Sequence, residues 1–281
     1  MIYIEPLGGL CNRMRAVNSA LCLAELTKQK MVIVWRENEE LNCPYTALFQ
    51  LPDTIRIITV NSLFSKIRSK LLYHFCKIHL DDADVLRLRN ENKVIEWENP
   101  QKLKSIYFKT GQQFADLPNF DFFQPVDDIV KRAGKIKERL GKQAIGIHIR
   151  RTDNKMAIEK SGLEGFVSAI EKELAVNPET MFYLATDDPT VEQEFVDKFN
   201  GHIVVQEGKK LDRNTESAIE DAYVDLLCLA ATQKIYGSFY SSFSEIGAAI
   251  GKIPLEIITS DGDMELSLIH ISEPTRLQLI S

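Results

Sequence analysis

In the second half of the chain, short apolar runs alternate with longer segments whose apolar residues recur at helical spacing. The runs predict strands at 144–149, 181–185, 202–205, 234–236 and 255–258. The segments between them predict helices at 162–175, 189–199, 216–232 and 242–250. Apolar strands that alternate with helices are typical of a parallel sheet covered by helices on both faces. We therefore expect a doubly wound α/β domain here.

The first half begins in the same way and then loses its regularity. The expected elements are strands at 2–5, 31–35 and 54–60 and helices at 12–28 and 62–75. The rest of the stretch 36–133 gives no clear pattern. The fold class expected for the whole chain is α/β, with two Rossmann-like lobes, 1–135 and 136–261, whose parallel sheets face each other across a cleft.

The end of the chain does not continue this pattern. Residues 262–281 include the run Ser-Leu-Ile-His-Ile-Ser-Glu-Pro-Thr-Arg, which fits no expected strand or helix. The run resembles translated cloning-adapter DNA, so we expect this segment to be a non-native tail outside the fold.

Charge and composition exclude several classes of protein. The 34 lysines and arginines against 40 acidic residues give a net charge of −6, whereas a general nucleic-acid-binding protein usually has a basic surplus. No apolar stretch approaches the roughly 20 residues that a membrane-spanning helix needs, and the first residues lack the pattern of a signal peptide. The five scattered cysteines form no zinc-binding spacing. We expect a cytoplasmic protein with neither a transmembrane segment nor a nucleic-acid partner.

In a sheet of parallel strands, ligands bind beyond the carboxyl ends of the strands. The expected strand at 144–149 leads into His-Ile-Arg-Arg-Thr-Asp. Because side chains alternate along a strand, His148 and Arg150 point to the same side. Arg150 and Arg151 place two guanidinium groups at this strand end, and arginine contacts phosphate through paired hydrogen bonds. The alternative is a surface cluster in which Asp153 neutralises one of the arginines.

Two acidic residues follow the next expected strand. Asp187 and Asp188 come directly before a proline that opens a helix. N-capping of that helix, or support of a ligand loop, explains this arrangement better than Mg²⁺ or Mn²⁺ binding does.

Two turns that lead into helices could present backbone N–H groups to an anion. After the expected strand at 234–236, Ser241 and Ser242 open a helix, and a helix N-terminus is a natural anion site. The plainer alternative is a serine N-cap in a capping box with Glu245. Near the start of the chain, two glycines precede Asn12 and Arg13; the pattern is neither GxGxxG nor a P-loop, and a tight βα turn explains it equally well.

These residues resemble those of the fucosyltransferase superfamily of glycosyltransferases, most closely the branch of α1,6-fucosyltransferases and bacterial nodulation fucosyltransferases. Three blocks match in order: Ile-Gly-Ile-His-Ile-Arg-Arg-Thr-Asp at 145–153, Tyr-Leu-Ala-Thr-Asp-Asp-Pro at 183–189, and the stretch from Asp225 to Ser242. The opening Gly-Gly-Leu-x-Asn-Arg is shared more widely in the superfamily. Residues 36–133 match no named family.

The resemblance implies a GT-B fold and an inverting transfer of L-fucose from GDP-fucose to a hydroxyl of a glycan acceptor, without a metal or other cofactor. The lobe 136–261 would bind the GDP-sugar, and the lobe 1–135 would lie on the acceptor side. The resemblance implies that His148 and Asp225 contact guanine, and that Arg150 and Ser242 or Ser241 bind the diphosphate. It implies that Arg151 and Asp153 shape the same loop and that Asp187 and Asp188 support the nucleotide. Asn12 and Arg13 would approach the donor from the other lobe.

One departure concerns the catalytic base. The α1,6 branch has a glutamate five residues after the aspartate of the arginine block, where this chain has Ile158. Glu159, one position later, is the candidate base for the acceptor hydroxyl. A transferase for another GDP-sugar, or a non-catalytic protein that binds a nucleotide sugar, are the alternatives that this departure leaves open.

Overall fold

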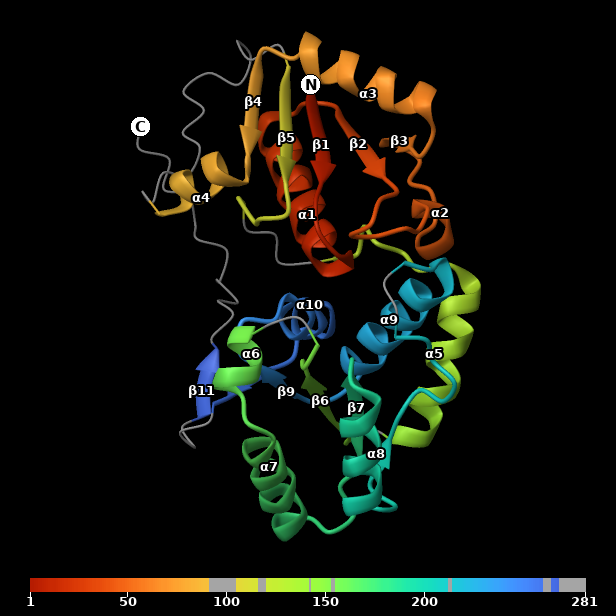
Figure 1. Cartoon of the computed structure of the whole chain (residues 1–281), viewed down its shortest axis with the longest axis vertical. Coiled ribbons are helices and arrows are strands. Elements are labelled where there is room, and N and C mark those ends of the chain that lie inside the picture. The colour runs from red at the N-terminus through yellow and green to blue at the C-terminus, as the bar shows by residue number, and fades with distance from the viewer. Residues whose placement is uncertain are drawn as a thin grey trace. The chain divides into compact units, whose positions relative to one another are not determined.

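The computed structural model describes residues 1–90, 105–115, 120–141, 143–152, 155–211, 214–259 and 264–267. The chain forms two compact units (Figure 1). The first unit contains residues 1–139 and 206–228, and the second contains residues 140–205 and 229–281. The stretch 206–228 thus groups with the first unit, whereas the sequence placed it in the second lobe. The functional division into an acceptor side and a donor side stays a prediction.

The first unit is built on a five-stranded sheet in the order β3-β2-β1-β5-β4, with every pairing parallel. Its strands are β1 (Ile2–Pro6), β2 (Met31–Arg36), β3 (Arg56–Val60), β4 (Ile78–Asp81) and β5 (Ile106–Thr110). Its helices are α1 (Leu10–Thr27), α2 (Tyr45–Leu48), α3 (Leu63–Phe75), α4 (Asp82–Asn90), α5 (Asp127–Leu140) and α9 (Glu216–Leu229). Leu72 and Cys76, at the end of α3, pack on the sheet face that carries Val34 and Tyr107.

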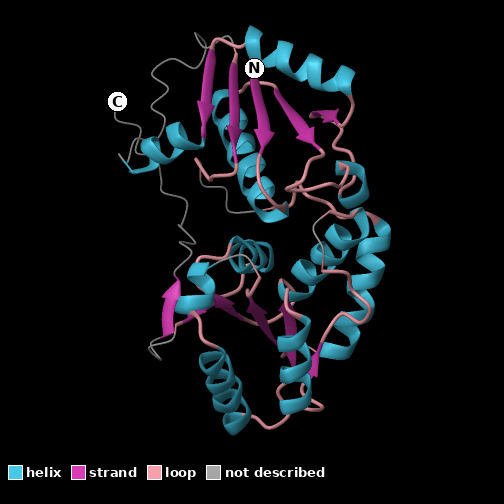
Figure 2. Cartoon of the chain, viewed as in Figure 1, coloured by secondary structure: helices cyan, strands magenta, loops and turns pink. Residues whose placement is uncertain are grey.

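The second unit has a six-stranded sheet in the order β11-β10-β9-β6-β7-β8, in which every pairing is parallel except that of β11 with β10 (Figure 2). Its strands are β6 (Ile145–Ile149), β7 (Phe182–Thr186), β8 (Ile203–Val204), β9 (Ile235–Ser238), β10 (Leu255–Ile258) and β11 (Met264–Ser267). Its helices are α6 (Lys155–Lys160), α7 (Leu163–Val176), α8 (Pro189–Lys198) and α10 (Ser242–Gly251). The predicted α/β class with two Rossmann-like units is confirmed.

The central strand β6 sends its side chains alternately to the two faces of the second sheet. Ile145, Ile147 and Ile149 pack in the apolar core with residues of α7 and α8. His148 points to the opposite face, where it meets Ser244 of α10. This close approach of α10 requires a glycine at 237, because a Cβ there would lie 2.6 Å from the Ser244 hydroxyl oxygen.

One prediction about the end of the chain is wrong in part. Residues 264–267, which we expected to lie outside the fold, form β11 and pair antiparallel with β10. The four residues Met-Glu-Leu-Ser do alternate apolar and polar side chains, but so short a run does not stand out, and strand pairing itself uses backbone groups. Within the described part of the chain, no helix is long and apolar enough to cross a membrane.

Candidate functional site

In the second unit, the loop after β6 is held by one carboxylate from the end of β7. Asp187 accepts the backbone N–H of Arg151 at 2.7 Å and the Thr152 hydroxyl at 2.6 Å. It also forms an ion pair with Arg150, with 3.1 Å between Nη1 and Oδ2. On the other side, the Ser238 hydroxyl accepts the backbone N–H of Arg150 at 2.9 Å. The loop that carries the two arginines is therefore fastened to both neighbouring strands of the sheet.

Asp187 is held in its ionised form by these contacts. Burial by itself raises the pKa of this carboxyl, but the Arg150 charge and the hydrogen bonds from Thr152 and Arg151 outweigh it and lower the pKa below 3.8. A permanent negative charge at this point fixes the Arg150 guanidinium at the carboxyl end of β6.

Arg151 turns its side chain toward α6 instead. Its guanidinium donates to the backbone oxygens of Ile158 at 3.3 Å and Ser161 at 2.8 Å. Its Nε is buried and has no hydrogen-bond partner among the described residues. Burial also lowers the pKa of Arg151. Arg151 thus shapes the segment that contains Glu159, an exposed residue of α6.

His148 is buried and held in one orientation. Its Nδ1 lies 2.7 Å from the Ser244 hydroxyl, and its ring stacks on Phe243 with 4.8 Å between the ring centroids. Its carbonyl accepts the Ser238 hydroxyl at 3.2 Å. Such a fixed ring suits the recognition of a planar ligand by one edge.

The N-terminus of α10 does not form the capping box that was the plainer alternative to an anion site. Ser241 is the N-cap residue, yet its side chain makes no cap hydrogen bond. A capping box needs its second residue at the third helical position, which is Ser244, whereas Glu245 lies one residue too far. The preceding Tyr240 has φ +53, so the chain turns sharply into the helix. The first N–H groups of α10, beginning at Ser242, are left without a serine cap.

The other acidic candidates have different settings. Asp188 is the N-cap of α8 and accepts the N–H of Thr190 at 2.8 Å and that of Val191 at 3.4 Å, so the N-capping interpretation is confirmed for it. Asp153 lies outside the described residues. Among the residues that the structure describes, no group of three His, Cys, Asp or Glu side chains could hold a metal ion.

Arg13, in the first unit, is fully buried in α1. Its guanidinium donates to the carbonyls of Gly8 at 2.8 Å and Arg36 at 2.6 Å, and to Asn38 at 2.7 Å. It also lies 5.0 Å from the centroid of the Trp35 ring. Burial lowers its pKa to about 10. These contacts give Arg13 a structural task, joining the first βα turn to the end of β2, and its predicted approach to the donor stays a prediction.

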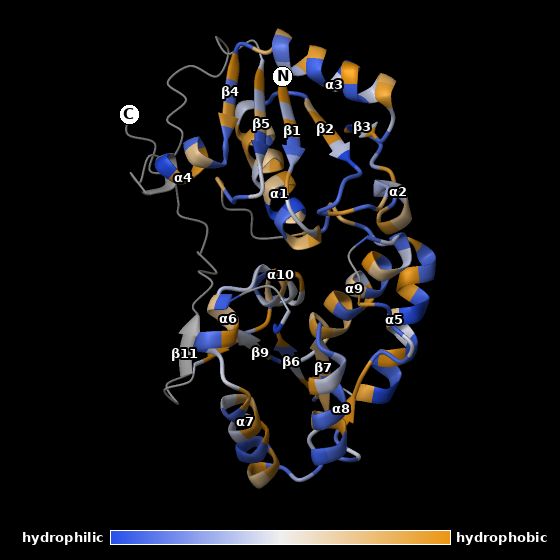
Figure 3. Cartoon of the chain, in the orientation of Figure 1, coloured by the Kyte–Doolittle hydropathy of each residue, from blue (hydrophilic) through white to orange (hydrophobic). Residues whose placement is uncertain are grey.

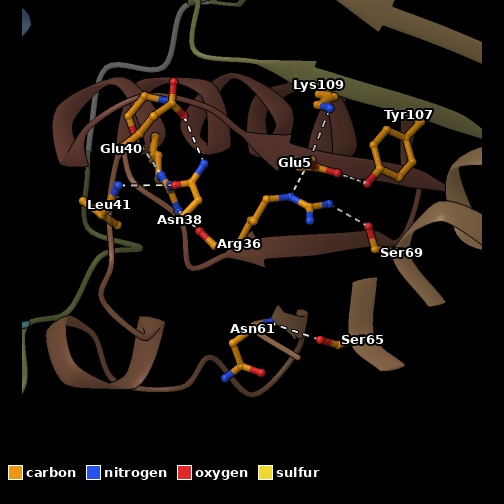
Figure 4. A network of polar contacts seen from close by, with 12 residues as sticks. Glu5, Arg36, Asn38, Glu40, Leu41, Asn61, Ser65, Ser69, Tyr107 and Lys109 are labelled. Carbon is orange, nitrogen blue, oxygen red and sulfur yellow. Dashed lines mark hydrogen bonds and ion pairs between the residues drawn. The ribbon is translucent and has the colours of Figure 1, made fainter. Parts of the chain in front are cut away.

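The glycine turn before α1 already holds a carboxylate of this chain. Glu40 accepts the backbone N–H of Gly8 at 2.9 Å (Figure 4). The Asn12 side chain lies over the same glycine, where a Cβ would come within 2.8 Å of its amide nitrogen. The site that a phosphate would take in many nucleotide-binding turns is thus occupied by the protein itself.

A buried charge network lies beside this turn, at the carboxyl ends of β1 and β2 (Figure 4). Glu5 accepts the Tyr107 hydroxyl at 2.5 Å and the Arg36 guanidinium at 2.8 Å. Arg36 also donates to Ser69 of α3 at 2.9 Å. An open cavity of about 450 Å³ adjoins the network; its lining residues are Arg36, Glu37, Asn38, Glu39, Glu40 and Lys66.

Asp225, also in the first unit, lies on α9 and forms a buried ion pair with Lys209, with 3.3 Å between Nζ and Oδ2. Lys209 was not singled out by the sequence, because an isolated lysine in a polar loop has no distinguishing pattern. Ser238 and Ser244 were missed for a different reason: serine is common near strand and helix ends. Alternation along β9 and helical spacing in α10 could have placed both beside β6.

No protein-family model and no curated protein matches the chain. Solved structures of fucosyltransferases do match it along most of its length. NodZ alpha-1,6-fucosyltransferase soaked with GDP-fucose is 16% identical, with a TM-score of 0.66, over 91% of this chain and 94% of that one. Fucosyltransferase NodZ from Bradyrhizobium is 18% identical, with a TM-score of 0.65, over 94% and 96%.

A third match is a mutant FUT1 from Arabidopsis thaliana in complex with GDP. It is 12% identical, with a TM-score of 0.60, over 91% of this chain and 69% of that one. The likeness is thus one of structure at low sequence identity. The chain has the GT-B type of fold found in these fucosyltransferases, as the resemblance of its sequence predicts.

Proposed function

We propose that the chain is an inverting glycosyltransferase that moves L-fucose from GDP-fucose to a hydroxyl of a glycan acceptor. The observation that carries the proposal is the loop after β6, in which Asp187 and Ser238 fix Arg150 at the carboxyl end of the central strand. That the chain shares its fold with structures soaked with GDP-fucose or bound to GDP supports the choice of donor. In the resembling sequences, this arginine block is the donor-binding motif.

The chemistry of the transfer explains why this arrangement would be needed. When the bond between fucose and the β-phosphate breaks, negative charge grows on the phosphate oxygens. A guanidinium held in place beforehand stabilises that charge without having to reorganise. The first N–H groups of α10, beginning at Ser242, would add the favourable end of the helix dipole. Because these groups supply positive charge, we propose that no metal ion is needed.

The guanine would be recognised by His148, an assignment that rests on the resemblance. The Ser244 bond and the Phe243 stack support it for His148, because they fix the ring before any ligand arrives. The proposed place of action is the cytoplasm, as the sequence expectations suggest.

The acceptor hydroxyl must lose a proton as it attacks the anomeric carbon of fucose from the side opposite the leaving GDP. Glu159 is the proposed base. It is exposed on α6, a helix whose end is tied to the donor loop through the Arg151 contacts with Ile158 and Ser161. This tie supports a fixed relation between the base and the diphosphate site within the second unit.

Calorimetric titration tests the donor site. We expect GDP and GDP-fucose to bind with and without EDTA, and UDP to bind much more weakly. GDP released from GDP-fucose on addition of acceptor glycans would then show transfer. Tight GDP binding without any release would favour a non-catalytic nucleotide-sugar-binding protein, and release from a different GDP-sugar would change the donor. No GDP binding would contradict the proposal.

Replacing the proposed base separates binding from chemistry. Glu159→Gln should lower turnover by roughly 10² to 10⁴ while GDP binding stays unchanged, because a general base acts only on the proton transfer. Glu164→Gln, on the neighbouring helix, is the matched control. If Glu159→Gln kept full turnover, Glu159 would not be the base.

A further inference from the structure

The helix α3 of the first unit turns its apolar side toward solvent. Five large apolar residues lie on its outer side, and three of them are among the most exposed of the chain: Leu63 at 77%, Phe64 at 78% and Phe75 at 79%. Ile67 and Leu71 complete the row. Placed at intervals of 100° around the helix, all five fall within an arc of about 120°, which they share with the exposed His74. We call these five residues the outer row. Figure 3 shows hydrophobic and hydrophilic residues in turn along α3.

The inner side of α3 is mostly small and polar. Ser69, which is 2% exposed, accepts a hydrogen bond from Arg36, and Leu72 packs on the sheet with Cys76. The start of the helix is fixed by a capping box between Ser62 and Ser65. The helix is therefore held in its orientation at several points, and its outer row cannot turn inward without breaking these contacts.

Basic residues border the outer row on both sides. Arg68 lies along one edge, and Lys70 and Lys66 lie along the other, all exposed. Within the described part of the chain, no ion pair neutralises these three side chains. The stretch 54–80 contains no aspartate or glutamate but has five lysines and arginines, in a chain whose net charge is −6. An apolar row bordered by positive charge is thus a local feature that runs against the overall composition.

We propose that α3 binds to the surface of a membrane that contains anionic lipids. The outer row enters the boundary between headgroups and acyl chains, while Arg68, Lys70 and Lys66 contact lipid phosphates. This pattern of large apolar residues on one side and lysine or arginine beside them is what binds a helix in the plane of a bilayer. The 13-residue helix is about 20 Å long and lies along the surface, since crossing a bilayer takes about 20 residues.

Other occupants fit the same surface less well. A second copy that met this one about a two-fold axis would bring the basic borders together, and like charges oppose such an interface. Protein interfaces are depleted of lysine relative to the rest of the surface, whereas this row is bordered by it. Charge complementarity therefore favours an anionic lipid surface.

Sedimentation of the full chain with lipid vesicles tests the proposal, and it requires neither nucleotide nor acceptor, so it is independent of the proposed function. We expect binding to vesicles of phosphatidylcholine mixed with phosphatidylglycerol, and much weaker binding to phosphatidylcholine alone. Added salt should reduce the binding, because it screens the lysines and arginines from the lipid phosphates.

Two pairs of substitutions probe the two parts of the surface. Phe64→Ser with Phe75→Ser should lower the partition into anionic vesicles on the order of 10²-fold, because two buried aromatic side chains are lost. Arg68→Gln with Lys70→Gln should lower it about 30-fold and reduce its dependence on salt. The matched control is Leu26→Ser with Val176→Ser, which removes apolar residues that are 67% and 85% exposed elsewhere and should leave the binding unchanged.

All substituted residues are exposed, so thermal unfolding and GDP titration should match those of the original chain and verify folding. The proposal is overturned if the original chain does not sediment with anionic vesicles, or if the phenylalanine pair and the control pair bind equally. Self-association that the phenylalanine pair abolishes, without any vesicle binding, would assign the surface to a second copy instead.

Discussion

Arg13 in the first unit and Arg150 in the second both lie near the carboxyl edge of a parallel sheet, yet they have opposite surroundings. Arg13 is fully buried, and its donors bind two backbone carbonyls and Asn38. Arg150 is partly exposed, and its guanidinium forms an ion pair with Asp187. One arginine therefore holds the fold together, whereas the other is positioned so that it can still meet an anion.

The starts of α1 and α10 also differ in whether the protein itself occupies them. In the first unit, Glu40 already accepts the N–H of Gly8 in the turn before α1. In the second unit, the Ser241 side chain leaves the start of α10 uncapped. The comparison shows that a strand end of a Rossmann-like sheet is not a ligand site by itself. We therefore expect an anion at the start of α10 rather than in the turn before α1, where Glu40 already occupies the N–H of Gly8.

The largest effect is expected for Arg13. Arg13→Leu should lower the free energy of unfolding by about 3–5 kcal/mol, because it leaves buried carbonyl groups and Asn38 without a donor. Urea unfolding measures this loss, and Arg87→Leu, at an exposed position, is the control. If the variant unfolded like the original chain but no longer bound GDP, Arg13 would be a ligand contact, and the difference in role between Arg13 and Arg150 would be disproved.

Arg150 should show the reverse behaviour. Arg150→Lys keeps the charge but loses the planar fork, so turnover should fall roughly 10²-fold and GDP should bind more weakly. The free energy of unfolding should change little. Arg139→Lys, at an exposed arginine of α5, serves as control in the same assays. Near-normal turnover would overturn the diphosphate assignment.

The contribution of Asp187 to the free energy of unfolding should depend on pH. Its pKa is lower in the folded chain than the ordinary 3.8, so ionisation favours folding. The stability it contributes is complete above about pH 5 and is lost as the pH falls through the folded pKa. Asp187→Asn should cost about 1–2 kcal/mol at pH 7 and progressively less below pH 3.8. Urea unfolding of both proteins at pH 7 and at a pH below 3.8 measures the difference. A loss of stability that did not change with pH would contradict the assigned ionisation.

The smallest effect is expected for Ser244, the hydrogen-bond partner of His148. Ser244→Ala removes the hydroxyl that orients His148, and the Kd for GDP should rise about fivefold. Ser168→Ala, at an exposed position of α7, is the control in the same titration. An unchanged Kd would mean that His148 does not contact the nucleotide.

The sequence predicted the second unit better than the first for a physical reason. The strands β6, β7, β9 and β10 are apolar runs separated by helices of clear periodicity, whereas β5, an equally buried interior strand of the first sheet, stands in a stretch without such a pattern and was missed. The strand β4 lies at a sheet edge and includes His79 and Asp81, and no pattern marked it. The helix α5 was hidden by its charged residues, although Ile129, Ala133 and Ile136 follow helical spacing and are buried.

The candidate site shows the same limit. The sequence segments that resemble the fucosyltransferase superfamily pointed to Arg150, Arg151 and Asp187, which the structure brings together at one strand end. Pattern alone could not show that Arg13 is buried, because its partners are backbone carbonyls and Asn38, which comes from a loop 25 residues away. The capping box with Glu245, offered as the plainer alternative at the start of α10, does not form there, whereas one forms between Ser62 and Ser65 of α3.

The pairing of β11 with β10 has a practical consequence for anyone who shortens this chain. A chain cut before residue 262 would leave the backbone N–H and C=O groups of β10 unpaired along its outer edge. Open strand edges attract other strands, so such a protein should tend to aggregate. A cut placed after Ser267 removes the last fourteen residues of the 281 and keeps that edge covered.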